Sequence, residues 1–155
     1  MTIKRFDISS AAFLSAADFN LSNREMNVII DICCDHNIKI VAIDKKIANL
    51  FDDTDCIEYA LCRKNGIILI KDDFKGWDPG EILFVIFHEL GHLVAEGGWD
   101  SEEMADQFAL KQLRRLYRSI KAQKIYRSAL LKLEGDYLDQ LKDDPDYSFR
   151  YKYLI

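Results

Sequence analysis

Two histidines and a glutamate in the second half of the chain have the spacing of a metal-dependent hydrolase. His88, Glu89 and His92 form the pattern H-E-x-x-H, and the chain contains three histidines in all. On a helix, residues four positions apart lie on one face, so both imidazoles can point toward one cation. Imidazole nitrogens are good zinc ligands, and a neighbouring carboxylate can take a proton from zinc-bound water. The pattern therefore predicts one zinc ion (Zn2+) held by His88 and His92, with Glu89 as the general base.

The residues around this pattern predict a buried helix from Pro79 to Ala95. Asp78 is of a type favoured at the helix N-cap, and proline suits the first helical position. The residues that follow are mostly apolar, and two adjacent glycines mark the end of the helix. Gly91 costs about 1 kcal/mol relative to alanine inside a helix. We therefore expect another segment to pack closely against that turn.

A catalytic zinc site usually has a third protein ligand, and the next predicted helix offers two glutamates. Asp100 is expected to cap this helix, which places Glu102 and Glu103 in its first turn. Glu102 begins a mostly apolar stripe at helical spacing, whereas Glu103 begins a polar one. The first stripe continues through Ala105, Asp106, Ala109, Leu113 and Leu116, and the second through Gln107, Lys111, Arg114 and Arg118. An inward carboxylate at the start of a buried stripe favours Glu102 as the third ligand.

Glu96 is the alternative third ligand, because it continues the spacing of the two histidines. Three residues at this spacing span roughly 12 Å along one helix, which is too far for a single ion with short bonds. If the two helices are antiparallel neighbours, Asp106 lies near the level of His88. Asp106 could then accept a hydrogen bond from the distal ring nitrogen of His88 and fix its orientation.

Stabilising the oxyanion of a peptide-hydrolysis reaction requires a further hydrogen-bond donor. His36, Tyr117 and Tyr126 are candidates by residue type alone, and His36 also fits the C-terminal end of a helix.

The two motifs together resemble the ImmA/IrrE family of zinc metallopeptidases. In that family the H-E-x-x-H helix is followed by E-x-x-A-[ND]-x-F-A, and residues 102–109 read E-E-M-A-D-Q-F-A. The resemblance covers about Asn37 to Leu116 and implies a gluzincin-like cytoplasmic peptidase. It also implies a protein or peptide substrate, typically a helix-turn-helix repressor of a phage or mobile element. The chain departs from the family in lacking an evident helix-turn-helix segment and a Leu-Met-Pro end to the second helix.

The remaining sequence predicts a zincin-like α+β fold in a single domain over residues 1–155. Ser22 and Glu25 form a capping box for a helix that ends near Asp35. Strands are expected at Ile38–Ile43, Ile57–Arg63 and Ile67–Lys71, the last two joined by a hairpin at Asn65-Gly66. This small sheet is expected to pack on the metal helix. The strand at Ile67–Lys71 is the expected edge for pairing with an extended peptide.

The C-terminal part is predicted to extend the motif-bearing core, residues 37–116, by helices over residues 117–155. We expect a long helix over residues 101–127, with one break allowed, and a further helix over Ser128–Leu141. Pro145 ends this helix. The alternating tail Phe149–Ile155 is predicted to form an added strand, with a partner-binding end as the alternative.

Composition favours a cytoplasmic globular protein that acts on neither nucleic acid nor membranes. The chain of 155 residues has 49% hydrophobic residues, 30% charged residues and a net charge of −5. A negative charge argues against nucleic-acid binding as the main task, so the basic stretch over residues 114–127 is interpreted as a solvated helix face. No run of 18 apolar residues is present. The four cysteines follow no disulfide or zinc-ribbon spacing and are expected to be reduced.

The main alternative is a non-catalytic metal-binding regulatory or interaction module of a toxin–antitoxin or phage system. Such a module has no need of Glu89 as a base. A simpler alternative is that both histidines are hydrogen-bonded core residues with no metal between them.

Overall fold

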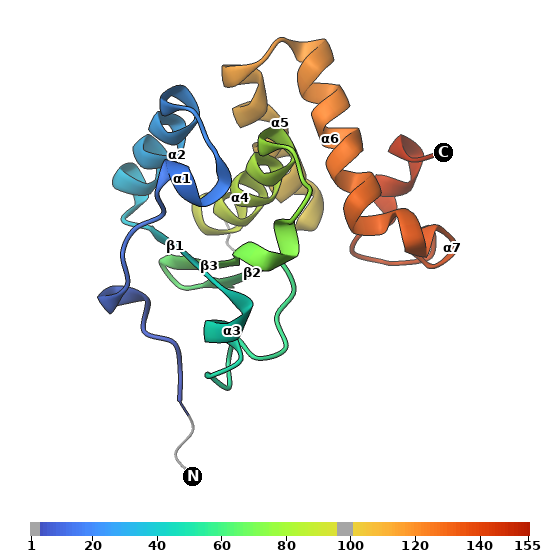
Figure 1. Cartoon of the computed structure of the whole chain (residues 1–155). Coiled ribbons are helices and arrows are strands. Elements are labelled where there is room, and N and C mark those ends of the chain that lie inside the picture. Colours follow the sequence, from blue (N-terminus) through green and yellow to red (C-terminus); the bar gives the residue numbers. More distant parts are fainter. Residues whose placement is uncertain (1–3, 96–100) are drawn as a thin grey trace. The chain divides into compact units, whose positions relative to one another are not determined.

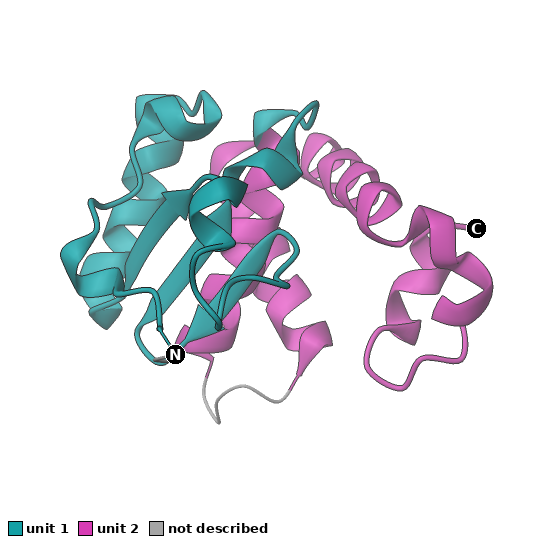
Figure 2. Cartoon of the chain, turned by 60° about the horizontal axis from the view of Figure 1, so that its bottom comes forward, with its two compact units in different colours: residues 1–79 teal, residues 80–155 magenta. Residues whose placement is uncertain are grey.

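The computed structural model describes residues 4–95 and 101–155 and belongs to the α+β class, as predicted (Figure 1). The chain divides into two compact units, residues 1–79 and 80–155 (Figure 2). None of the helices within the described ranges combines the length and hydrophobicity of a transmembrane segment.

The first unit begins with short helices and one long helix, α2, whose start follows from its capping residues. The Ser22 hydroxyl accepts a hydrogen bond from the backbone N–H of Glu25 at 3.1 Å, and the Glu25 carboxylate accepts one from Ser22 N–H at 2.7 Å. This confirms the predicted capping box. Asn37 ends α2 in the left-handed conformation, with φ of +54°. The helical segments are η1 (Ile8–Ser10), α1 (Ala16–Phe19), α2 (Asn23–His36), α3 (Lys45–Ala48) and η2 (Lys71–Phe74).

Three short strands form one mixed sheet in this unit: β1 (Lys39–Ile43), β2 (Ala60–Arg63) and β3 (Gly66–Ile70). The order is β1-β3-β2, with β1 parallel and β2 antiparallel to β3. The predicted hairpin is confirmed, and the left-handed turn residue is Asn65, with φ of +66°. Because β3 has a paired neighbour on each side, the prediction that it offers a free edge to a peptide was wrong.

The sheet residues on one face share an apolar core with the segments around them. Val41 and Ile43 of β1 and Ile68 and Ile70 of β3 are buried together with Ala48 of α3. Their alternation along each strand is the period of two that a pleated strand imposes. Every residue of β3 is buried, as expected for a central strand.

The second unit consists of helices. They are α4 (Pro79–Val94), α5 (Glu102–Leu116), α6 (Ser119–Glu134), η3 (Gly135–Tyr137), α7 (Leu138–Leu141) and η4 (Ser148–Tyr153). The helix α4 begins at Pro79 and is buried along most of its length, as its sequence predicts.

Two C-terminal predictions were wrong. The one break allowed in the long helix falls at Tyr117 and Arg118, both extended, but the predicted helix boundary near Arg127 was wrong, because α6 runs through it. The tail forms the 3-10 segment η4 instead of an added strand, and it buries Arg150.

Candidate metal centre

The helices α4 and α5 supply the three side chains that come together. His88 and His92 lie one turn apart on α4, and Glu102 is the first residue of α5. The start of α5 is fixed by Ser101, whose hydroxyl accepts a hydrogen bond from Met104 N–H at 3.1 Å. Ser101 therefore caps this helix. The residues proposed from the sequence as the cap and as the alternative ligand, Asp100 and Glu96, lie outside the described residues.

A glycine allows α5 to approach α4 closely. A Cβ atom built on Gly91 would lie 3.1 Å from the Cα of Ala105 and 3.2 Å from its carbonyl oxygen. It would also lie 3.2 Å from the Cβ of Phe108. The expectation that another segment packs on this turn is therefore confirmed. This contact brings the first turn of α5 beside the histidines.

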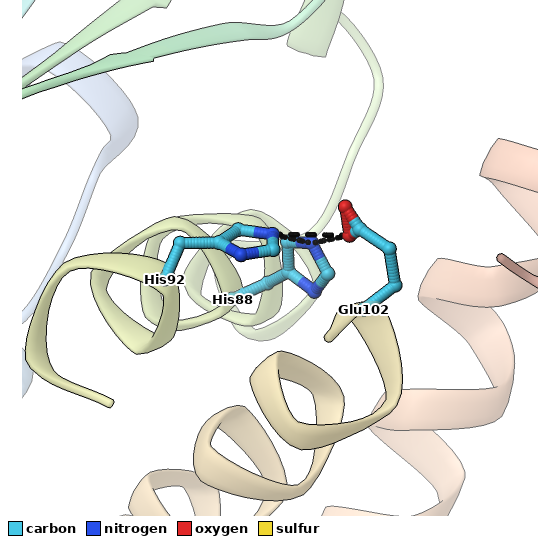
Figure 3. Close-up of side chains that lie close together, drawn as sticks. All are labelled: His88, His92 and Glu102. Atoms are coloured by element: carbon cyan, nitrogen blue, oxygen red, sulfur yellow. Dashed lines mark hydrogen bonds and ion pairs between the residues drawn. The ribbon is translucent and has the colours of Figure 1, made fainter. Parts of the chain in front are cut away.

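Two ring nitrogens and one carboxylate oxygen converge at this place (Figure 3). The Nε2 atoms of His88 and His92 are 3.2 Å apart. The Oε2 atom of Glu102 lies 3.0 Å from Nε2 of His92 and 3.4 Å from Nε2 of His88. The two rings come from one helix and face the carboxylate at the start of the next. This group could hold a metal ion.

Glu103, the second glutamate in the first turn of α5, faces away from this group. Glu103 is exposed, as are the polar residues that follow it at helical spacing. Glu102 is half-buried, and the stripe that it begins is buried from Ala105 through Leu116. The buried face of α5 is thus the one inferred from periodicity, the face that begins with Glu102.

Asp106 contacts the first histidine from the other side. Its Oδ1 atom lies 2.7 Å from Nδ1 of His88, the contact that the helix spacing predicts. An ionised carboxylate can only accept hydrogen bonds, so Nδ1 carries the proton in this pair. In the neutral ring, Nε2 of His88 then presents its lone pair toward Glu102 and His92.

Burial and hydrogen bonding act in opposite directions on these groups. Burial alone would lower the pKa of His88, but its hydrogen bonds to Asp106 and Glu102 outweigh it and raise the pKa to about 9. Burial would likewise raise the pKa values of Glu102 and Asp106. Hydrogen bonds from the histidines, and from Arg150 in the case of Asp106, lower both pKa values instead. Both carboxylates are therefore anionic at neutral pH.

Glu89 lies on α4 beside the two histidines and is partly buried. Burial raises the pKa of Glu89, the nearby histidines oppose this rise, and the Glu102 carboxylate adds to it. A carboxyl group with a raised pKa can both take up and return a proton at a pH closer to neutrality.

Two C-terminal residues that the sequence did not single out lie close to the candidate site. Arg150, in η4, donates hydrogen bonds to both oxygens of Asp106. Tyr147, just before η4, is half-buried, and burial together with the Glu102 carboxylate raises the pKa of its hydroxyl. The Arg150 guanidinium lies 4.7 Å from the centre of the Tyr147 ring. The alternating pattern of residues 149–155 predicted a strand and indicated the position of neither residue.

The three sequence candidates for an oxyanion donor fall in different places. Tyr126 is buried and donates its hydroxyl proton to Asp106 at 2.8 Å. Tyr117 follows the last residue of α5, with the Lys121 ammonium 5.0 Å from its ring centre. His36 is the exposed last residue of α2, in the first unit, which agrees with its interpretation as a helix C-terminal residue.

Comparison with known proteins gave no match to a family model, a curated protein or a solved structure. The resemblance to the ImmA/IrrE family therefore rests on the sequence, and chiefly on the two motifs, residues 88–92 and 102–109. The functional argument that follows rests on the geometry of the site.

Proposed function

We propose that the second unit contains the metal centre of a zinc-dependent peptidase. The supporting observation is the convergence of two imidazole nitrogens and one carboxylate oxygen, all separated by 3.0 to 3.4 Å. Two ligands bound to one tetrahedral zinc at about 2.0–2.1 Å lie roughly 3.3–3.4 Å apart, so the observed spacing fits this ion. A set of three protein ligands with nitrogen and oxygen donors is typical of catalytic rather than structural zinc.

The residues have separate roles in this proposal. His88, His92 and Glu102 hold the ion, and Asp106 holds the ring of His88 through Nδ1. Bound zinc supplies two effects, a lower pKa for a coordinated water and polarisation of a carbonyl group. Glu89 takes the proton released by the water and returns it to the departing amine. Its raised pKa suits both halves of this transfer.

Tyr147 is the residue best placed to donate to the carbonyl oxygen as negative charge develops there. Burial raises the pKa of the Tyr147 hydroxyl, and the nearby carboxylates of Glu102 and Glu89 add to this rise, so the side chain lies close to the candidate site. It is anchored by its own backbone N–H, which donates to Asp144 at 3.2 Å. One well-placed donor of this kind contributes about 3 kcal/mol to the stabilisation of a transition state.

The resemblance to the ImmA/IrrE family supplies the substrate class. By that resemblance, the substrate is a protein, a helix-turn-helix repressor of a phage or mobile element, whose cleavage relieves repression. The negative net charge of the chain agrees with a role that does not require contact with DNA.

The proposal is tested by incubating the zinc-loaded protein with a helix-turn-helix repressor encoded beside its gene. Cleavage is followed by mass spectrometry, with and without a chelator. We expect Glu89→Gln to retain zinc and to lose cleavage, because it removes the base and none of the ligands. Glu103→Gln is the matched control, since it makes the same chemical change on the exposed face of α5.

Cleavage by Glu89→Gln at the wild-type rate would show that another group is the base. Stable binding of the repressor without cleavage would support the interaction module instead. Cleavage that persists after complete removal of the metal would exclude the zinc mechanism.

A further inference from the structure

Asp106 has an unusually complete set of hydrogen-bond donors for a buried carboxylate. It is 2% exposed, and each of its two oxygens accepts two hydrogen bonds. Oδ1 lies 2.7 Å from His88 Nδ1 and 2.8 Å from Nη2 of Arg150. Oδ2 accepts from the Tyr126 hydroxyl and from Nε of Arg150, both at 2.8 Å.

Arg150 is as deeply buried as the carboxylate it contacts. It is 3% exposed and lies 44 residues further along the chain, in η4. Its third nitrogen, Nη1, donates to Glu134 at 3.2 Å. The guanidinium is also flanked by aromatic rings, with the Tyr147 and Phe84 ring centres at 4.7 and 5.9 Å.

We propose that Arg150 is a positioning residue of the metal centre. By fixing both oxygens of Asp106, it holds the ring of His88 with Nε2 turned toward the other two donor atoms. This inference rests on the proposed metal-binding function and adds the C-terminal segment η4 to the residues on which metal affinity depends.

The physical reason is the geometry of the guanidinium fork. Two parallel N–H bonds fix the plane of a carboxylate, which a single donor cannot do. Without Arg150, the described partners of Asp106 are a phenol hydroxyl and His88 itself, and both can rotate. The carboxylate could then turn, and the ring that it orients would turn with it. Partners that orient metal-binding histidines typically contribute 10- to 100-fold to metal affinity.

The two arms of Arg150 allow a positioning role to be separated from a purely structural one. One arm holds Asp106, and the other holds Glu134. If Arg150 served only to fasten η4 to the rest of the unit, loss of either arm would have similar consequences. If it positions His88, loss of the Asp106 arm alone should lower metal affinity.

The test measures zinc affinity of the full-length protein by competition with a chromophoric chelator. We expect Arg150→Gln to weaken zinc binding by about 10- to 100-fold. Arg150→Lys should recover part of this loss, because lysine keeps the charge but donates as a point rather than as a fork. Glu134→Ala, which removes the acceptor of the other arm, should stay within about threefold of wild type. Lys152→Gln is the matched control for loss of a cation, since Lys152 is exposed in the same segment.

A second measurement reports on His88 itself. The zinc-loaded chain has three histidines, so their ring N–H protons can be assigned by nuclear magnetic resonance. The Nδ1 proton of His88 should exchange slowly with water in the wild type and in Glu134→Ala, and faster in Arg150→Gln. Circular dichroism establishes which variants are folded, and Arg150→Lys serves if Arg150→Gln does not fold.

The positioning role would be overturned if a folded Arg150→Gln or Arg150→Lys variant bound zinc as tightly as the wild type and its His88 Nδ1 proton exchanged at the wild-type rate. That result would leave the proposed metal-binding function intact. An equal loss of zinc affinity in Glu134→Ala would show that Arg150 only fastens η4 to the rest of the unit, and would overturn the positioning role. A wild-type chain that binds no zinc would overturn the proposed function and this inference with it.

Discussion

Replacing Gly91 by alanine should separate α5 from α4 and weaken metal binding, although alanine is the better helix former. The added methyl group would meet Ala105 at 3.1 and 3.2 Å and Phe108 at 3.2 Å. Carbon atoms at optimal contact are about 3.5–4.0 Å apart, so α5 must retreat by several tenths of an ångström. These atoms belong to the backbone or are attached directly to it, so they move only with the helix.

The expected magnitude is the difference between two effects. Replacing glycine by alanine in a helix interior stabilises the helix by up to about 1 kcal/mol. Overpacking of a close contact costs about 1–3 kcal/mol. Gly91→Ala should therefore lower the free energy of unfolding by up to about 2 kcal/mol. Glu102 begins the same turn of α5 as Ala105, so its carboxylate should shift away from the histidines. We expect zinc affinity to fall about tenfold, which corresponds to about 1.4 kcal/mol.

The measurement pairs denaturant unfolding of the metal-free protein with zinc competition, and Gly135→Ala is the matched control. Gly135 has φ of −57° and ψ of −34°, and no atom lies within 4 Å of a Cβ built there. The control should gain stability and keep its zinc affinity. If Gly91→Ala gained as much stability as the control and bound zinc as tightly as wild type, the close approach of the helices would not govern the site.

Two further predictions concern chemistry at the same place. Tyr147→Phe should slow peptide hydrolysis by about 100- to 1000-fold. Its zinc affinity should stay within about threefold of wild type. The control is Tyr137→Phe, at a tyrosine that is 61% exposed, and it should change neither the rate nor the affinity. An unimpaired rate in Tyr147→Phe would remove this residue from the mechanism. In the metal-free protein the pKa of His88 is about 9, so a cation must displace one proton from that ring at lower pH. Zinc affinity should therefore rise about tenfold per pH unit up to about pH 9, and a constant affinity between about pH 7 and 9 would contradict that raised pKa.

The part of the site that sequence could predict is the part built from neighbouring residues. His88 and His92 share a helix face at fixed spacing, and the periodicity of α5 separates Glu102 from Glu103. Both inferences use only the 3.6-residue repeat. Gly91, between the histidines, also predicted a close contact, because glycine destabilises a helix interior and a closely packed neighbour is a reason for its presence there.

The part that sequence could not predict depends on contacts between distant segments. Arg150 reaches Asp106 across 44 residues from a 3-10 segment whose alternating sequence predicted a strand instead. The break at Tyr117 carries neither glycine nor proline, so ordinary helix-ending signals are missing there. The central place of β3 follows from its parallel pairing with β1, which no local pattern encodes.

The most direct test of the central claim is the zinc content of the purified chain and of two glutamate variants after dialysis. If His88, His92 and Glu102 hold one ion, the wild type retains one zinc per chain, Glu102→Ala loses it, and Glu103→Ala keeps it. A wild type without zinc, or Glu102→Ala with a full complement of zinc, would contradict the account.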